Sequence, residues 1–273
     1  MNHFEGRSIQ SRLRVTGRPK LTPALRRSAY LLHEYEKAFG EEFKVELDPG
    51  LAWKWPETPV FNVEKEDRDV APTSGPRSEA RFEYRLCHNE NALAAFNEAL
   101  PDEEHITRFN RQMPVGLFEG KVRSDEEHRW TPGGKSAIDA WALSKSKRVM
   151  HLFELKVDGN VKVGIIPEAL YYASLLSHVR ENRAMTFDVR KSQGLLAVRE
   201  HKPRIVMWLV APKFHPLVVG PGRSDERVSP LDALNRSFSD KSGVEFRILP
   251  YELDATGGEL TRWKWEDAWM GLR

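Results

Sequence analysis

The chain is predicted to adopt an α/β fold with a mixed central β-sheet flanked by helices, and three observations indicate this class. Apolar residues dominate segments 137–143 and 148–157, which have the length and composition of strands. Residues 165–181 follow with the apolar spacing of a helix. Residues 205–210 (IVMWLV) then form a strand rich in apolar side chains.

The remaining segments extend this order. A helix is predicted at residues 90–100, because Asn89 can cap its first turn. A short strand is predicted at residues 115–122, a helix at residues 231–238 and a last strand at residues 244–249. The order is therefore helix, three strands, helix and strand (αβββαβ), followed by one more helix and strand.

A polar segment with prolines and a glycine predicts where the chain divides. Residues 64–80 (EKEDRDVAPTSGPRSEA) have the composition of a linker or long loop. We therefore expect an accessory region at residues 1–80 and a core at residues 81–273. Within the accessory region, Thr22 and the proline after it indicate a helix start, and the alternation at residues 43–47 indicates a strand.

Both ends of the chain carry features with two interpretations. Residues 1–30 hold seven lysines and arginines against the single acid Glu5. This arm is either a phosphate-binding segment that attracts nucleic acid or a solvated tail. In the C-terminal tail, Trp263, Trp265 and Trp269 are expected to pack on the core, and base stacking is the alternative.

The composition excludes several classes of protein. The 273 residues are 40% hydrophobic and 30% charged, which is ordinary for a soluble globular chain. No apolar run approaches the ~20 residues that span a bilayer, and we expect a cytoplasmic protein without a membrane partner. Cys87 is the only cysteine, which excludes an internal disulfide and a thiolate zinc cluster.

Two charged residues on one strand are the first candidate for chemistry. Glu154 and Lys156 are two positions apart and share a face of the predicted strand, while Phe153 and Leu155 point to the other face. Charges on an otherwise apolar strand must be paired or bind a ligand, because bare burial costs several kcal/mol. The pair therefore indicates either a structural ion pair or a binding site.

A third charged residue lies on the preceding strand. Asp139 is flanked by apolar residues, and the turn at residues 144–147 is short enough for the two strands to pair as a hairpin. Asp139 and Glu154 would then meet on one face beside Lys156. Two carboxylates beside a lysine suit Mg²⁺, with Mn²⁺ as a substitute and the Leu155 carbonyl as a further ligand. A water activated by the metal and oriented by Lys156 would attack a phosphate.

The pattern resembles that of the PD-(D/E)xK nuclease superfamily, which includes restriction enzymes and RecB-like exonucleases. Asp139 is followed by fourteen residues and then by Glu154, Leu155 and Lys156, and Ile138 stands where the motif names a proline. The resemblance covers roughly residues 88–250. It implies a restriction-endonuclease-like core, Mg²⁺ dependence, phosphodiester hydrolysis, and catalytic roles for the two acids and the lysine.

The same resemblance implies residues that contact nucleic acid. Glu168 and Tyr172 lie four apart on one helical face, where RecB-like members carry a glutamine and a tyrosine. Alternatively, Glu168 complements the helix dipole and Tyr172 packs on the sheet. Lys135 precedes the predicted strand at residues 137–143, and Lys162 precedes the predicted helix at residues 165–181. Either lysine could contact phosphate, and the alternative for Lys162 is a solvated side chain.

A further metal ligand is implied on the first core helix. Many members of the superfamily place a glutamate there, and Glu90 is the candidate in this chain. The alternative is a first-turn acid that complements the helix dipole. Glu119, on the predicted first strand, is the competing candidate for the metal site.

Three functional hypotheses follow from these residues. The first is a Mg²⁺-dependent nuclease, which we expect to act on DNA. The second is a catalytically inactive nucleic-acid-binding protein of the same fold. The third is an unrelated α/β protein in which Glu154 and Lys156 form a structural ion pair. A homodimer is open under each of them.

Overall fold

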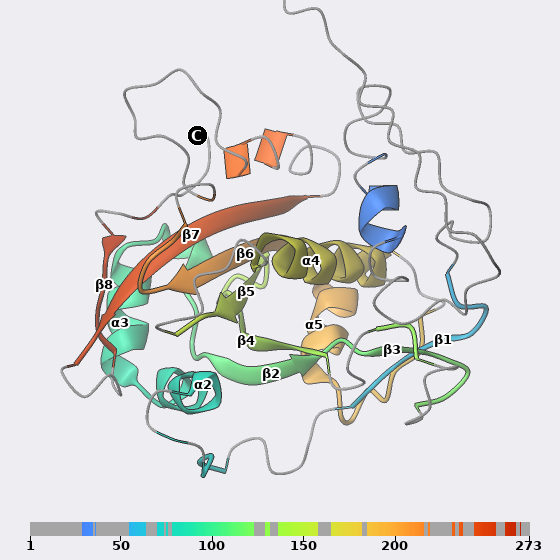
Figure 1. Ribbon diagram of the computed structural model, residues 1–273, viewed down its shortest axis with the longest axis horizontal. Coiled ribbons are helices and arrows are strands. Elements are labelled where there is room, and N and C mark those ends of the chain that lie inside the picture. The colour runs from blue at the N-terminus through green and yellow to red at the C-terminus, as the bar shows by residue number, and fades with distance from the viewer. Residues whose placement is uncertain are drawn as a thin grey trace, which may run out of the picture.

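The computed structural model describes most of the chain beyond residue 77 and shorter stretches before it (Figure 1). The described residues are 29–34, 36, 55–63, 70–73, 75, 78–122, 129–131, 136–157, 165–181, 185–215, 218, 231–232, 235–236, 243–254, 260–265 and 268. Part of the predicted N-terminal helix is described, since residues 29–34 are helical. The basic arm before residue 29, the predicted strand at residues 43–47 and Trp269 lie outside the described residues.

The predicted mixed sheet is confirmed and has six strands in the order β2-β4-β5-β6-β7-β8. The neighbours β5, β6 and β7 are parallel, and the other pairs are antiparallel. The strands are β2 (Asn110–Pro114), β4 (Ala137–Leu143), β5 (Val149–Leu155), β6 (Arg204–Ala211), β7 (Val244–Leu253) and β8 (Leu260–Trp263).

The hairpin predicted from the short turn is also confirmed. β4 and β5 pair from Leu143↔Met150 to Ala140↔Phe153, and β4 has the predicted bounds. The turn closes through a hydrogen bond from the Ser144 N–H to the Val149 carbonyl, 2.8 Å long. This register places Asp139 and Glu154 next along the two strands, just beyond the last paired residues.

Helices cover both faces of the sheet and bury a separate core on each (Figure 1). One face carries α4 (Ile165–Glu181), which has the predicted bounds, and α5 (Gln193–His201) packs against it. The other face carries α2 (Glu79–Cys87) and α3 (Glu90–Glu98). β6 is apolar from Ile205 to Ala211, since this part of the strand is buried on both faces of the sheet.

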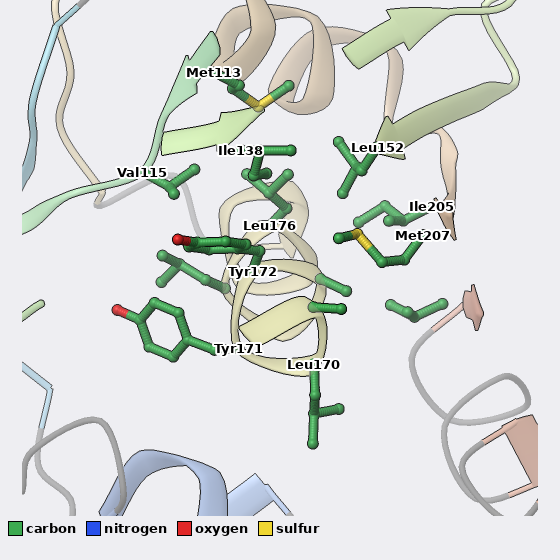
Figure 2. Close-up of a cluster of buried hydrophobic side chains, with 14 of the residues drawn as sticks. Met113, Val115, Ile138, Leu152, Leu170, Tyr171, Tyr172, Leu176, Ile205 and Met207 are labelled. Carbon is green, nitrogen blue, oxygen red and sulfur yellow. The ribbon is translucent and has the colours of Figure 1, made fainter. Parts of the chain in front are cut away.

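The core under α4 draws side chains from several strands. Figure 2 shows Met113 of β2, Ile138 of β4 and Leu152 of β5 gathered near Leu176 and Tyr172 of α4. Tyr30 and Phe61, from the segment predicted to be accessory, are buried in this same core.

Several elements differ from the prediction. The helix α2 begins inside the predicted linker, where the Ser78 hydroxyl accepts a hydrogen bond from the Arg81 N–H and caps the first turn. β2 and α5 had no predicted counterpart. The predicted strand at residues 115–122 is the short β3 (Leu117–Glu119), which pairs with β1 (Pro59–Phe61) outside the main sheet.

Other predictions at the two ends of the core are confirmed. Asn89 caps α3 by accepting a hydrogen bond from the Ala92 N–H at 2.9 Å. Trp263 is buried in the core under α2 and α3, as expected for a terminal element that packs on the sheet. Among the described residues, no helix combines the length and the apolar character needed to cross a membrane.

Candidate active site

A fork between β4 and β5 forms the centre of the candidate site. Backbone pairing of the two strands ends at Ala140↔Phe153, and Asp139 lies one residue beyond it. Its Oδ2 atom accepts a hydrogen bond from the Leu155 N–H at 2.8 Å. A side-chain carboxylate therefore takes the place of a backbone acceptor at the point where the strands separate.

Lys156 lies immediately after β5 and is held there by its backbone. Its N–H donates to the Val210 carbonyl at 2.8 Å, and its own carbonyl accepts from the Tyr251 hydroxyl at 2.9 Å. The side chain bends back along the strand, and its Nζ donates to Glu154 Oε1 at 2.5 Å. The predicted shared face of Glu154 and Lys156 is thus observed as a direct contact.

Glu154 has one carboxylate oxygen in use and one that is not. The residue is only 3% exposed, and within the described part of the chain its Oε2 atom has no hydrogen-bond partner. A buried acceptor left without a partner destabilises a fold by about 1–3 kcal/mol. A buried oxygen of this kind, on a residue beside other charged groups, calls for an explanation, and a bound ligand is one.

The predicted pair on α4 reaches the same centre. Glu168 Oε2 lies 3.8 Å from Lys156 Nζ, and the Tyr172 hydroxyl donates to Glu168 Oε1 at 3.4 Å. Tyr172 is buried in the core under α4, which fits its alternative role of packing on the sheet. Both interpretations of this pair therefore have a contact that supports them.

Two acids that the sequence analysis did not single out also face the centre. Glu79 Oε1, in the first turn of α2, lies 4.0 Å from Lys156 Nζ. Glu83, one turn later, accepts a hydrogen bond from Arg111 Nε at 2.9 Å. The negative charge of Glu83 also contributes to raising the pKa of Asp139. The i, i+4 spacing of Phe82 and Leu86, apolar residues of α2, is the signal that could have revealed this helix.

The remaining predicted residues lie elsewhere. Glu90 is exposed in the first turn of α3. The helix acids whose charges raise the pKa of Asp139 come from α2 instead. The Glu119 carboxylate accepts hydrogen bonds from the N–H groups of Glu57 and Thr58, which ties it to the β1–β3 pair. Lys135 and Lys162 lie outside the described residues.

The electrostatics of the centre are unbalanced. Burial raises the pKa of Asp139 to about 7, although Lys156 and the Leu155 N–H oppose this shift. Burial, and then the charge of Asp139, raises the pKa of Glu154 well above its ordinary value. Burial opposes the charge on Lys156, but the charges of Glu154 and Asp139 outweigh it and raise the lysine pKa. The centre therefore holds more acid than its cation can neutralise.

No group of three or more histidine, cysteine, aspartate or glutamate side chains forms a ready metal cage among the described residues. The protein-derived oxygens at the fork are those of Asp139 and Glu154. Two carboxylates are the number that Mg²⁺ usually takes from a protein, because it keeps several waters and shares substrate phosphate.

Comparison of the chain with protein-family models, with curated proteins and with solved structures finds no match. What bears on function is therefore the geometry of the fork and of the charges around it.

Proposed function

We propose that this protein is a Mg²⁺-dependent nuclease with a restriction-endonuclease-like core, which hydrolyses phosphodiester bonds of DNA. One observation carries the proposal above all others. Two carboxyl groups and one ammonium group from the β4–β5 fork are gathered at one point, and a buried oxygen of Glu154 has no hydrogen-bond partner among the described residues. The resemblance of the spacing from Asp139 to Glu154 and Lys156 to the PD-(D/E)xK motif supports the same proposal.

The residues at the fork fit a magnesium ion. The free Glu154 Oε2 and the Asp139 carboxylate are hard oxygen ligands, and the excess of acid is what a divalent cation would neutralise. The Leu155 carbonyl lies between the two functional side chains and is the proposed third ligand from the protein. Bound there, Mg²⁺ would supply Lewis-acid activation of the attacking water and of the phosphate.

Lys156 acts in this proposal as a protonated hydrogen-bond donor. Its raised pKa keeps the ammonium charged at neutral pH, so it is suited to orient the attacking water and to offset negative charge on the phosphate. It is poorly suited to remove a proton, because a general base must first be neutral.

Glu168 and Tyr172 have a supporting role in this proposal. A carboxylate so close to the centre repels a phosphate unless a cation stands between them. We assign Glu168 to holding Lys156, whose Nζ lies 3.8 Å away, and Tyr172 to orienting Glu168. Lys135 and Lys162 are the proposed phosphate contacts of the flanking segments.

A structural ion pair is the second candidate, and the contact between Lys156 Nζ and Glu154 Oε1 at 2.5 Å favours it. In that case Mg²⁺ would have no specific effect on the protein. Under the nuclease proposal, Mg²⁺ raises the melting temperature of the wild-type protein in a concentration-dependent way, because a ligand that binds only the folded state stabilises it. Asp139→Asn removes this shift.

Cleavage assays test the proposed activity directly. Purified protein is incubated with plasmid, linear duplex, single-stranded DNA and RNA, each with Mg²⁺, Mn²⁺ or EDTA. We expect metal-dependent cleavage that Asp139→Ala and Lys156→Ala abolish while circular dichroism stays unchanged. Asp102→Ala and Lys145→Ala are matched controls, because both residues are exposed and lie away from the fork. Full activity of either fork variant contradicts the proposal, and binding of DNA without cleavage by any metal supports the inactive-binder alternative.

A further inference from the structure

Gln112 has an unusual backbone conformation for its place in the fold. Its φ is 42°, and the other described non-glycine residues with positive φ are Lys147 and Lys202. Lys147 lies in the hairpin turn and Lys202 caps α5, both places where left-handed residues are common. Gln112 instead lies in the middle of β2. A strained residue inside a strand persists only where surrounding contacts hold it.

The ladder between β2 and β4 is interrupted at this residue. Arg111↔Ala140 and Met113↔Ile138 are paired, but the position between them, where Gln112 faces Asp139, is missing from the ladder. In the described β2–β4 ladder, Asp139 therefore has no paired residue on β2.

The alternation of faces is also reversed at the break. Residues two apart on a regular strand share a face. Ile138 and Ala140 are two apart, yet Ile138 is buried under α4, as Figure 2 shows, and Ala140 is buried under α2 and α3. The side-chain alternation of β4 therefore changes between Ile138 and Ala140, and Asp139 is the residue at which it changes.

Glu83 of α2 contacts β2 at the interruption and holds Gln112 in its left-handed conformation. Arg111 Nε donates to Glu83 Oε1 at 2.9 Å, and Gln112 Nε2 donates to Glu83 Oε2 at 3.4 Å. Consecutive strand residues normally point to opposite faces, but here both reach one carboxylate. Glu83 is 4% exposed, so this contact is part of the packing between α2 and the sheet.

We infer that the left-handed backbone of Gln112, held by Glu83, positions Asp139. The interruption of the β2–β4 pairing at Gln112 directs the Asp139 carboxylate toward the fork between β4 and β5. The catalytic meaning of this positioning depends on the proposed nuclease function. Its structural consequence does not, because the direct readout is the hydrogen bond from the Leu155 N–H to Asp139 Oδ2.

Two substitutions at one position isolate the backbone conformation. Gln112→Gly and Gln112→Val both remove the hydrogen bond to Glu83. Glycine adopts positive φ without strain, whereas β-branched valine strongly disfavours it and favours a regular strand. The two variants share the loss of this hydrogen bond and differ in whether their backbone accepts the left-handed conformation.

Amide hydrogen exchange at Leu155 gives the first readout. We expect exchange at Leu155 in Gln112→Val to be faster than in Gln112→Gly, because Asp139 returns toward the ladder and releases the N–H. Lys147→Val is the matched control, since it places valine at a φ of 60° in the hairpin turn. It should reduce stability without a selective change at Leu155. If Gln112→Val does not fold, Gln112→Ala replaces it, because alanine also disfavours positive φ.

Cleavage kinetics give the second readout. A displaced carboxylate should lower the kcat of Gln112→Val about a hundredfold below that of Gln112→Gly while KM changes little, since small misplacements of catalytic groups have effects of this order. Equal Leu155 exchange in the glycine and valine variants overturns the inference. If the wild-type protein cleaves nothing, the proposed function fails, and the exchange comparison still decides the positioning role of Gln112.

Discussion

Two clusters of buried charge lie at opposite ends of β5, and they differ in how their charge is balanced. At the carboxyl end is the fork, with Asp139, Glu154 and Lys156. At the amino end is an ion network in which Arg247 donates to both oxygens of Glu104, at 2.6 and 2.9 Å. The network also contains Arg204 and Glu245, so two acids face two arginines.

The same burial has opposite consequences in the two clusters. At Glu104, burial opposes the charge, but the hydrogen bonds and charge of Arg247 outweigh it and lower the pKa to about 2. At Asp139, burial outweighs the attraction of Lys156 and raises the pKa to about 7. The acids and arginines of the network balance one another, whereas the fork holds two acids beside a single lysine. This difference is the physical reason to assign structure to one and function to the other.

His151 shows how completely the network end is satisfied. Trp208 Nε1 donates to His151 Nδ1 at 3.0 Å, so His151 Nε2 carries the proton and donates to the Glu104 carbonyl at 3.0 Å. Burial lowers the pKa of His151 to about 3, which keeps the ring neutral. Both ring nitrogens are used, and the residue is best explained as part of the core rather than as a catalytic base.

The largest expected contrast is in activity. Glu154→Gln should lower the rate of nucleic-acid cleavage by roughly 10²–10³-fold, because a charged ligand at the centre is lost. Glu104→Gln should leave the rate per folded molecule unchanged. The measurement is initial cleavage rate in Mg²⁺ at a temperature where both variants are folded. A similar loss in both variants would remove the distinction between the two clusters.

The next contrast is in stability, where the order of the two variants reverses. Glu104→Gln should lower the free energy of unfolding, because buried Arg247 loses one of its two acidic partners and keeps only Glu245. The loss should stay below the about 3–5 kcal/mol that a fully unpaired buried charge costs. The midpoint and slope of urea unfolding measure this loss. Arg262→Gln is a suitable control, since Arg262 pairs with Glu252 at the surface, where an ion pair contributes little.

Glu154→Gln should stabilise the metal-free protein by about 1 kcal/mol, because burial and the charge of Asp139 disfavour a carboxylate at this position. Glutamine keeps an acceptor for Lys156 and removes the repulsion from Asp139, while Lys156 retains Glu79 and Glu168 nearby. Urea unfolding in EDTA measures the gain. A clear loss of stability would favour the structural ion pair over the proposed metal site.

The last contrast is in the pH dependence of stability, where the two clusters have effects of opposite sign. Asp139 has a folded pKa of about 7 against an ordinary value of 3.8, so its ionisation opposes folding increasingly from pH 3.8 to about 7. The stability gained by Asp139→Asn should therefore grow over this range and level off above it. A gain that is constant from pH 4 to 8 would contradict the raised pKa.

The network variant should behave in the reverse way. Glu104 has a folded pKa of about 2 against an ordinary value of 4.5, so its contribution to stability is full above pH 4.5 and is lost as the pH falls toward 2. The stability lost in Glu104→Gln should therefore shrink below pH 4.5. Thermal unfolding at a series of pH values measures both effects in one set of experiments.

Regular elements of the sheet were predictable from the sequence. β4 and α4 have the predicted bounds, and the short turn gave the hairpin that brings Asp139 and Glu154 together. These elements carry a clear apolar pattern because β5 is buried along its whole length and most residues of β4 and α4 are buried.

Elements whose pattern is broken were not predictable. β2 (NRQMP) contains the left-handed Gln112 and has no apolar alternation in its sequence. Arg111 reaches Glu83 of α2, whereas Met113, two positions later, lies in the core under α4. The helix α2 is short and begins in a segment with the composition of a linker. Missing it meant missing Glu79 and Glu83, which lie beside the fork.

The sequence by itself determined the layers of the fold and the local geometry of Glu154 and Lys156, because periodicity reports which face of its own element a residue occupies. The tertiary structure alone decided which charges meet. Arg247 and Glu104 are 143 residues apart, and Tyr251 reaches the Lys156 carbonyl from 95 residues away. Contacts of that kind depend on how the helices and strands pack together. The residue pattern of one helix or strand does not indicate which charged residues its neighbours bring.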